Sequence, residues 1–138
     1  MGWRWITKSA LKVLHSESLA THGGGEGLRD EGLRDEGLLD SALARPLNLV
    51  AYADADAPPD VAALAASYTA GLAKNYPFID DSKRAAFLAT GLFLYLNGYR
   101  LSASQAEATI TMPAVAIGDI TEDAFADWLR QLAHKKSG

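Results

Sequence analysis

The chain has 138 residues, a length that suits one compact domain with its own core. Hydrophobic residues make up 49% of it and cysteine is absent, which excludes a disordered chain and sites built from disulfides or thiolates, and indicates a reducing, cytoplasmic setting. The net charge of -4 argues against a basic nucleic-acid surface, and the longest apolar run, 85–96, is too short to span a membrane.

The first half of the chain alternates between segments of helical periodicity and loops rich in glycine, aspartate or proline. A helix is predicted over 9–21, followed by a charged, glycine-rich loop or hairpin over 26–38. A short helix over 40–44 is expected to end before Pro46, and a second loop is predicted over 54–59. The first half is therefore expected to consist of short helices separated by exposed loops.

Asp60 is placed to cap the helix that follows, because its carboxylate can accept backbone N–H groups that are free at a helix N-terminus. The apolar residues after it repeat at helical intervals and predict one buried stripe. They are Val61, Leu64, Ala65, Tyr68 and Leu72.

The most apolar helix is predicted over 83–96, and because it is apolar on nearly every side, we expect it to be the central helix. Asn97 and Gly98 would end it, and two further helices are predicted over 104–117 and 121–133. No β-rich stretch is longer than a few residues. The predicted fold class is therefore all-α, with a single domain over 1–138.

A five-residue unit is duplicated inside the first loop. Residues 27–31 read Gly-Leu-Arg-Asp-Glu, and residues 32–36 repeat the same letters. A unit of this size is too short for a solenoid repeat. We interpret it as a local duplication in an exposed loop, where insertions are tolerated.

The segment 75–86 leads from a polar loop into the N-terminus of the most apolar helix. Backbone N–H groups are free at such an end, and the helix dipole favours an anion there. Lys83 and Arg84 oppose that dipole, and a bound phosphate would account for them, with Asp80 beside it to hold Mg²⁺. The alternative is that the aspartates cap the helix and pair with Lys83 and Arg84, and the local pattern by itself favours this alternative.

The same segment resembles the active-site motif of the Fic/Doc family, His-x-Phe-x-Asp-(Gly/Ala)-Asn-(Lys/Gly)-Arg. Phe78, Asp80, Lys83 and Arg84 match the motif, and Pro77 matches its commonest form. The family reading outweighs simple helix capping, because the matching residues stand in the right order between two predicted helices.

The resemblance extends to both sides of the motif. Residues 5–46 are similar to the N-terminal half of death-on-curing proteins of this family, and residues 87–99 are similar to the helix after the motif. It covers essentially the whole chain. It implies a single-domain Fic fold, which is a helical bundle with a short flap hairpin before the motif.

The resemblance also implies catalytic positions. Tyr76 stands where the family has the histidine that acts as general base, and Asp80 stands where the family holds Mg²⁺. Ser82 occupies the anion-hole position, and Lys83 and Arg84 would bind the phosphates of ATP. In such a site, positioning and charge neutralisation carry most of a phosphoryl transfer.

Lys83 is typical of the death-on-curing branch, whereas members that transfer AMP usually have glycine there. The resemblance therefore implies the toxin of a toxin–antitoxin pair, which transfers the γ-phosphoryl group of ATP to a threonine of elongation factor Tu and halts translation. Its binding partner would be a prevents-host-death type antitoxin. Neither a membrane nor direct nucleic-acid binding is implied.

The chain departs from the motif at three positions, so we expect it to be inactive. Tyr76 is a poor base, because a phenol titrates near 10 and an imidazole near 6.5. Asp81 stands where the phosphate-binding part has Gly or Ala, and it adds a negative charge beside the phosphates. Ser82 replaces an asparagine and loses its amide donor. The duplication at 27–36 also falls where the flap should be.

The sequence is also compatible with two other functions. One is transfer of AMP to a protein hydroxyl, and the other is a catalytically dead module that still binds its antitoxin. A degenerate natural relative and a deliberately inactivated toxin both fit the departures.

The remaining polar and aromatic residues have simpler interpretations. His15, His22 and His134 lack zinc-site spacing, and Lys135 and Lys136 are predicted to form a frayed basic C-terminus. Five acidic residues in the last third of the chain are predicted to form a solvated surface: Glu107, Asp119, Glu122, Asp123 and Asp127. The aromatic residues predicted to pack in or at the edge of the core are Trp3, Trp5, Tyr68, Phe87, Phe93, Tyr95 and Trp128.

Overall fold

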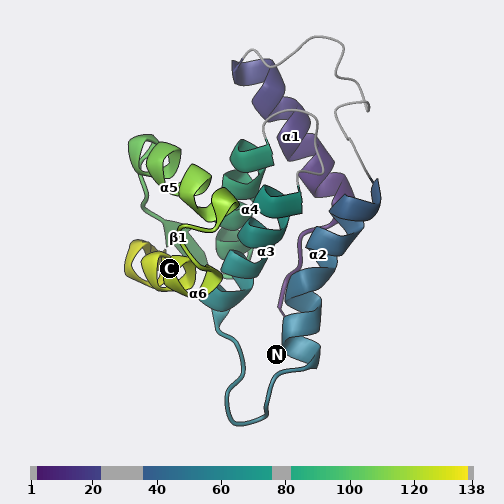
Figure 1. Cartoon of the computed structure of the whole chain (residues 1–138), viewed down its shortest axis with the longest axis vertical. Coiled ribbons are helices and arrows are strands. Elements are labelled where there is room, and N and C mark those ends of the chain that lie inside the picture. The colour runs from purple at the N-terminus through teal and green to yellow at the C-terminus, as the bar shows by residue number, and fades with distance from the viewer. Residues whose placement is uncertain (1–2, 23–35, 76–81, 137–138) are drawn as a thin grey trace.

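The computed structural model of the chain describes residues 3–22, 36–75 and 82–136 (Figure 1). Helices dominate this part of the chain, which confirms the predicted all-α class. In chain order the elements are α1 (Lys8–His22), α2 (Glu36–Ala51), α3 (Val61–Asn75), α4 (Ser82–Leu96), β1 (Tyr99–Leu101), α5 (Gln105–Ile117), α6 (Glu122–Leu132) and β2 (Ala133–Lys135).

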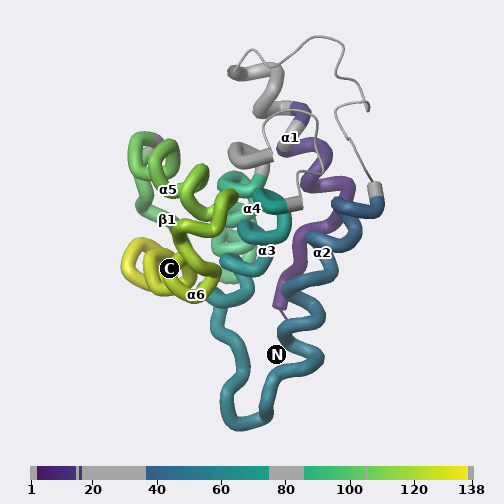
Figure 2. The backbone as a smooth tube through the Cα atoms, viewed as in Figure 1, coloured from purple at the N-terminus to yellow at the C-terminus, as the bar shows by residue number. Residues whose placement is uncertain are grey.

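The helices α3 and α4 lie side by side in the middle of the fold, and the other helices cover them from two sides. Helices α1 and α2 lie on one side of this pair, and α5 and α6 lie on the other (Figure 1). Figure 2 follows the backbone from α2 through the loop at 52–60, which turns at one end of the molecule, and into α3. Helix α3 contacts α2, α4, α5 and α6, so it is the hub of the bundle.

The helix predicted to be central, at 83–96, is one of the middle pair as α4, but its partner α3 is the more completely buried of the two. Every residue from Leu64 to Ala73 is buried, and the whole predicted stripe lies within the buried set. In α4, by contrast, the described burial falls on one face, and Tyr95 on the other side is 55% exposed. Helix α3 is rich in alanine, and small side chains let neighbouring helices approach it from several directions at once.

Helix α2 is much longer than the short helix predicted at 40–44. It begins at Glu36 and continues through Pro46 to Ala51, so residues 36–38 are helical rather than part of a loop. A proline inside a helix costs about 3 kcal/mol relative to alanine. The helix continues because Pro46 itself is buried, as are Leu39 and Ala42 on the side that packs against α3.

The C-terminal residues are ordered by pairing, which corrects the prediction of a frayed end. Strand β2 runs antiparallel to β1, with Lys135 opposite Tyr99. The N–H of Lys136 donates to the carbonyl of Gly98 over 2.9 Å, and its ammonium lies 3.4 Å from the centre of the Tyr95 ring. These contacts tie residues 133–136 to the end of α4.

The N-terminal segment lies against the central helix pair. The rings of Trp3 and Trp5 pack on Phe93 of α4, with centroids 6.3 and 5.9 Å apart, and the N–H of Ile6 donates to the Tyr68 hydroxyl over 3.1 Å. These contacts confirm the core role predicted for the aromatic residues that take part in them. Tyr95 is mostly exposed instead, and it meets Lys136.

Two of the local signals at helix ends hold in the described residues, although the one at Pro46 does not. Asp60 caps α3 by accepting the N–H of Ala63 over 2.9 Å, and Gly98 follows α4 with a φ of 94° that glycine adopts readily. The flap expected at 27–36 lies outside the described residues, apart from Glu36, which begins α2. Within the described parts of the chain, no helix has the length and hydropathy that crossing a bilayer requires.

Candidate functional site

The predicted site falls at the junction between α3 and α4. Of its residues, Tyr76, Asp80 and Asp81 lie outside the part of the chain that the structure describes. For Ser82, Lys83 and Arg84 the backbone is described, and these three residues form the first turn of α4, which begins one residue before the predicted start at Lys83. The backbone N–H groups of this turn have no partner within the helix, so the turn offers donors and a positive dipole end.

The packing of α3 against α4 brings the two ends of the motif segment together. The Thr69 and Thr90 hydroxyls hydrogen bond to each other across the buried interface, and the rings of Tyr68 and Phe93 lie 5.1 Å apart. From these contacts α3 extends about 9 Å to its last residue, Asn75, and α4 begins about 12 Å before Thr90, at a rise of 1.5 Å per residue. The two helices are antiparallel, so the motif segment connects two neighbouring helix ends.

Arg45 braces the hub helix, and sequence reasoning missed this role. Its guanidinium donates to the Ser67 carbonyl over 3.1 Å and forms an ion pair with Glu122 over 2.9 Å. The stem of the side chain passes over Gly71, where an added Cβ would lie 2.9 Å from the Arg45 Cδ. The Arg45 side chain thus links α2, α3 and α6. No local sequence pattern predicts these contacts, because the partners of Arg45 are 22 and 77 residues away.

A second charged cluster joins the start of α3 to α6. Arg130 donates to Asp60 through Nε over 2.8 Å and to Asp127 through Nη1 over 2.6 Å. The hydrogen bond from Arg130 lowers the pKa of Asp60 below its usual value, while partial burial acts in the opposite direction and the N–H of Ala63 adds to the lowering. The same bond to Asp60 raises the pKa of Arg130, so both groups stay charged at neutral pH.

The acidic residues predicted to form a solvated surface lie at the surface, four of them exposed and Glu122 half-buried, and several also have partners. Glu122 pairs with Arg45 and Asp127 pairs with Arg130, whereas Glu107 accepts the N–H of Ser104 in a capping box at the start of α5. Three of the five residues therefore have definite structural partners.

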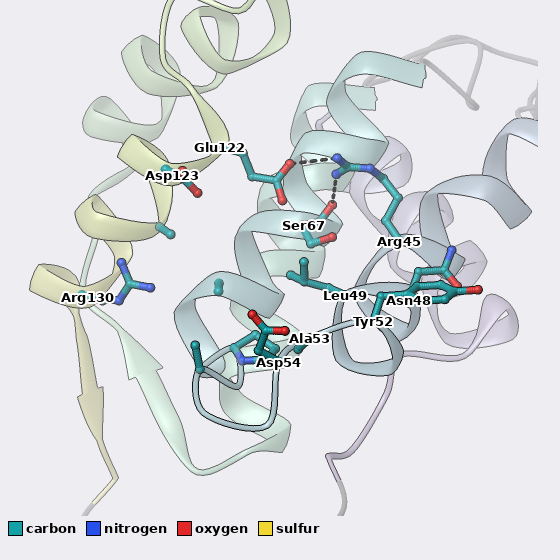
Figure 3. Close-up of a pocket in the computed structure, with 14 residues that line it drawn as sticks. Arg45, Asn48, Leu49, Tyr52, Ala53, Asp54, Ser67, Glu122, Asp123 and Arg130 are labelled. Carbon is teal, nitrogen blue, oxygen red and sulfur yellow. Dashed lines mark hydrogen bonds and ion pairs between the residues drawn. The ribbon is translucent and has the colours of Figure 1, made fainter.

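A cavity of about 650 Å³ opens between α2, the loop at 52–60, α3 and α6 (Figure 3). In the close-up, Arg45 reaches across to Glu122 and Ser67, while Asp54 rises from the loop and Asp123 stands on α6. The cavity uses the N-terminal part of α3, whereas the motif follows its C-terminal end. The residues that line it are Arg45, Asn48, Leu49, Tyr52, Ala53, Asp54, Ala57, Pro59, Ala63, Ser67, Glu122, Asp123, Ala126 and Arg130.

The described residues contain no group of three or more His, Asp or Glu side chains that could hold a metal ion. Asp80, the predicted Mg²⁺ position, is outside those residues. His134 pairs instead with the Ser102 hydroxyl, 3.2 Å from its Nε2, beside the β1–β2 pair.

The comparison with protein families matches the first two thirds of this fold. The model of the Fic/DOC family matches residues 5–94, which runs from the N-terminal segment through the motif and most of α4 and includes well over half of the chain. No curated protein matches the chain. Proteins of the matched family transfer phosphate or AMP groups to other proteins. The chain belongs to the Fic/DOC family.

Proposed function

We propose that this protein is a toxin of the death-on-curing type whose motif, as it stands, does not support phosphoryl transfer at a rate that would arrest growth. The active lineage reaction would move the γ-phosphoryl group of ATP to a threonine of elongation factor Tu in the cytoplasm. Lys83 supports this branch over AMP transfer, for which glycine is usual at that position. The observation that carries the proposal is Tyr76, which stands where the family has its general base. The same motif keeps the carboxylate for Mg²⁺, Asp80, and the two cations, Lys83 and Arg84.

The base position determines the rate of proton removal from the target threonine. A tyrosine with an ordinary pKa near 10 is ionised in about one molecule in a thousand at pH 7, whereas an imidazole titrates near 6.5. General-base catalysis contributes about 10²- to 10⁴-fold in rate. Tyr76 therefore removes a contribution large enough to abolish toxicity by itself.

The phosphate-binding end is altered as well. Lys83 and Arg84, in the first turn of α4, have the charge to hold nucleotide phosphates, and Asp80 has the carboxylate that Mg²⁺ prefers. Asp81 adds a second carboxylate close by, and repulsion from a phosphate at ~4 Å reaches up to about 4 kcal/mol at an effective dielectric near 20. Ser82 offers a short hydroxyl in place of an amide donor. We expect weak ATP binding in addition to slow chemistry.

Labelled ATP tests the chemistry directly. Purified chain and elongation factor Tu are incubated with ATP labelled at the γ or the α position, and growth is followed after expression in bacteria. The unchanged chain should transfer neither label and should not arrest growth. The triple variant Tyr76→His, Asp81→Gly, Ser82→Asn should transfer the γ label far better than the sum of the single variants, because residues that act as a unit are not additive.

A matched control separates restored catalysis from other effects of the substitutions. Adding Asp80→Asn to the triple variant should abolish transfer again, because the carboxylate for Mg²⁺ is lost. Strong γ transfer by the unchanged chain would contradict the proposal, and transfer of the α label would favour AMP transfer. If Tyr76→His alone is as active as the triple variant, the argument about Asp81 and Ser82 is wrong.

We further propose that the protein still binds an antitoxin despite its altered motif. In the sequence, the departures at 76, 81 and 82 belong to the motif segment and fall outside the buried stretch from Leu64 to Ala73 in α3. A prevents-host-death type antitoxin would bind through a disordered tail that becomes helical on the toxin, with coupled folding and a negative heat-capacity change. Calorimetry with such a tail should show saturable binding. Absence of binding while circular dichroism shows intact helix would contradict this part of the proposal.

A further inference from the structure

The cavity between α2, α3 and α6 has more carboxylates than cations in and around its lining. Both cations in its wall are already neutralised, Arg45 by Glu122 over 2.9 Å and Arg130 by Asp60 and Asp127 over 2.8 and 2.6 Å. Two more carboxylates, Asp54 and Asp123, line the same cavity. Within the described chain, no hydrogen bond or ion pair reaches the side chain of either one. The surplus of carboxylates creates a potential that attracts a cation and repels nucleic acid.

Part of the cavity lining is apolar. Alanine and proline side chains from the loop and from α3 and α6 line it: Ala53, Ala57, Pro59, Ala63 and Ala126. The Tyr52 side chain at the edge is 85% exposed, and an exposed aromatic ring is a good surface for a guanidinium or ammonium group. An arginine can meet a ring face and a carboxylate at once, because its guanidinium is planar and carries several donors.

The apolar surface continues beyond the cavity along the last turns of α2. Leu47, Leu49 and Val50 are 44%, 37% and 37% exposed, next to Tyr52. Leu49 also lines the cavity, whereas Leu47 and Val50 lie at other angles around the same turns of the helix. Exposed apolar residues beside a polar rim are typical of protein interaction sites, and they offer more surface than a small cation would cover. The chemistry therefore favours a polypeptide over a free amine.

We propose that the cavity formed by α2, α3 and α6, together with the exposed C-terminal turns of α2, binds an arginine-bearing segment of a partner protein. The arginine meets the carboxylates of Asp54 and Asp123, the Tyr52 ring offers a further surface for a cation, and apolar residues beside the arginine cover Leu49. The site is separate from the catalytic motif, since Ser67 and Ala63 of its wall lie about 12 and 18 Å along α3 from Asn75. A partner held here leaves the motif end of the bundle free (Figure 1).

A model peptide tests the site without knowledge of the natural partner. The probe is a short peptide with two arginines and two leucines among alanines and glutamines, titrated into isotopically labelled full-length chain. Its matched control carries glutamates in place of the arginines, and free arginine amide represents a small cation. We expect saturable shifts of backbone amide resonances at 47–57 and 122–130 with the arginine peptide, weaker binding at higher salt, and no binding of the glutamate peptide.

Variants at exposed positions locate the contact while leaving the fold intact. The double variant Asp54→Lys, Asp123→Asn should weaken the arginine peptide about tenfold or more, and Tyr52→Ser should weaken it as well. Asp119→Lys is the control, since Asp119 is exposed and does not line the cavity. Equal binding of the glutamate peptide, shifts confined to other surfaces, or an affinity for arginine amide equal to that of the peptide would each overturn the proposal. Circular dichroism confirms that each variant is folded.

Discussion

Two glycines in the central helices offer a matched test of the packing described here. In α3, a Cβ added at Gly71 would lie 2.9 Å from the Cδ of Arg45 and 3.2 Å from both the Cα and the Cβ of Ala42. In α4, a Cβ added at Gly91 would meet nothing within 4 Å. Substitution to alanine therefore has the same effect on helix propensity at both positions, but it creates a steric clash only at Gly71.

The magnitudes follow from these distances. Replacing glycine by alanine inside a helix stabilises it by about 0.8 to 1 kcal/mol. At Gly91 nothing opposes this gain, so Gly91→Ala should raise the free energy of unfolding by up to about 1 kcal/mol. At Gly71 the new methyl group must displace the backbone of Ala42 and a side chain that is tied to Ser67 and Glu122, and overpacking of this kind costs about 1 to 3 kcal/mol. We expect Gly71→Ala to be less stable than Gly91→Ala by about 1 to 3 kcal/mol.

Urea unfolding followed by circular dichroism measures both changes against the unchanged chain. A third variant makes the test sharper, because Arg45→Ala removes the Cδ that the new methyl group would touch. In that background the cost of Gly71→Ala should shrink, which gives a favourable coupling energy in a double-mutant cycle. If Gly71→Ala is as stable as Gly91→Ala, or if Arg45→Ala leaves its cost unchanged, the close approach of α2 and α3 at this glycine is wrong.

Further predictions concern the contacts of Asp60 and of Tyr68. Asp60→Asn keeps an acceptor for the helix cap but loses the charge pair with Arg130, so the loss of stability should be below about 1 kcal/mol, and Asp60→Ala should cost about 0.5 to 2 kcal/mol more. Since the folded state lowers the pKa of Asp60, its contribution is present above about pH 4 and disappears as the pH falls through the folded value, so urea titrations of the unchanged chain and Asp60→Asn should converge in acid. Tyr68→Phe leaves the buried N–H of Ile6 without its acceptor and should cost about 1 to 3 kcal/mol, with faster hydrogen exchange at that amide. Unchanged exchange at Ile6 would refute the bond.

The helix boundaries that rest on local chemistry could be predicted from the sequence. Asp60 and Thr121 each accept the N–H group of the third residue after them, and Gly98 supplies a positive φ, so each signal lies within one turn of the helix end that it marks. Proline misled the prediction at position 46, because the local cost of a proline is offset by the burial of α2 against α3, and no short window contains that information.

The sequence predicts the residues of the motif, but it does not predict the cavity. The identities of Tyr76, Asp81 and Ser82, and the start of α4 beside them, could be read from consecutive residues, and the family match over 5–94 includes them. The cavity at the other end of α3 could not be read in this way. Its walls come from α2, the loop after it, α3 and α6.

The sequence by itself determined the helical class, the capped ends and the family, because each depends on neighbouring residues or on an ordered motif. Only the tertiary structure decided that the alanine-rich α3 is the hub, since its burial depends on four other helices that pack against it. It also decided that Arg45 neutralises Glu122, and so which carboxylates remain available around the cavity, because those two residues meet only when α2 and α6 approach the same helix.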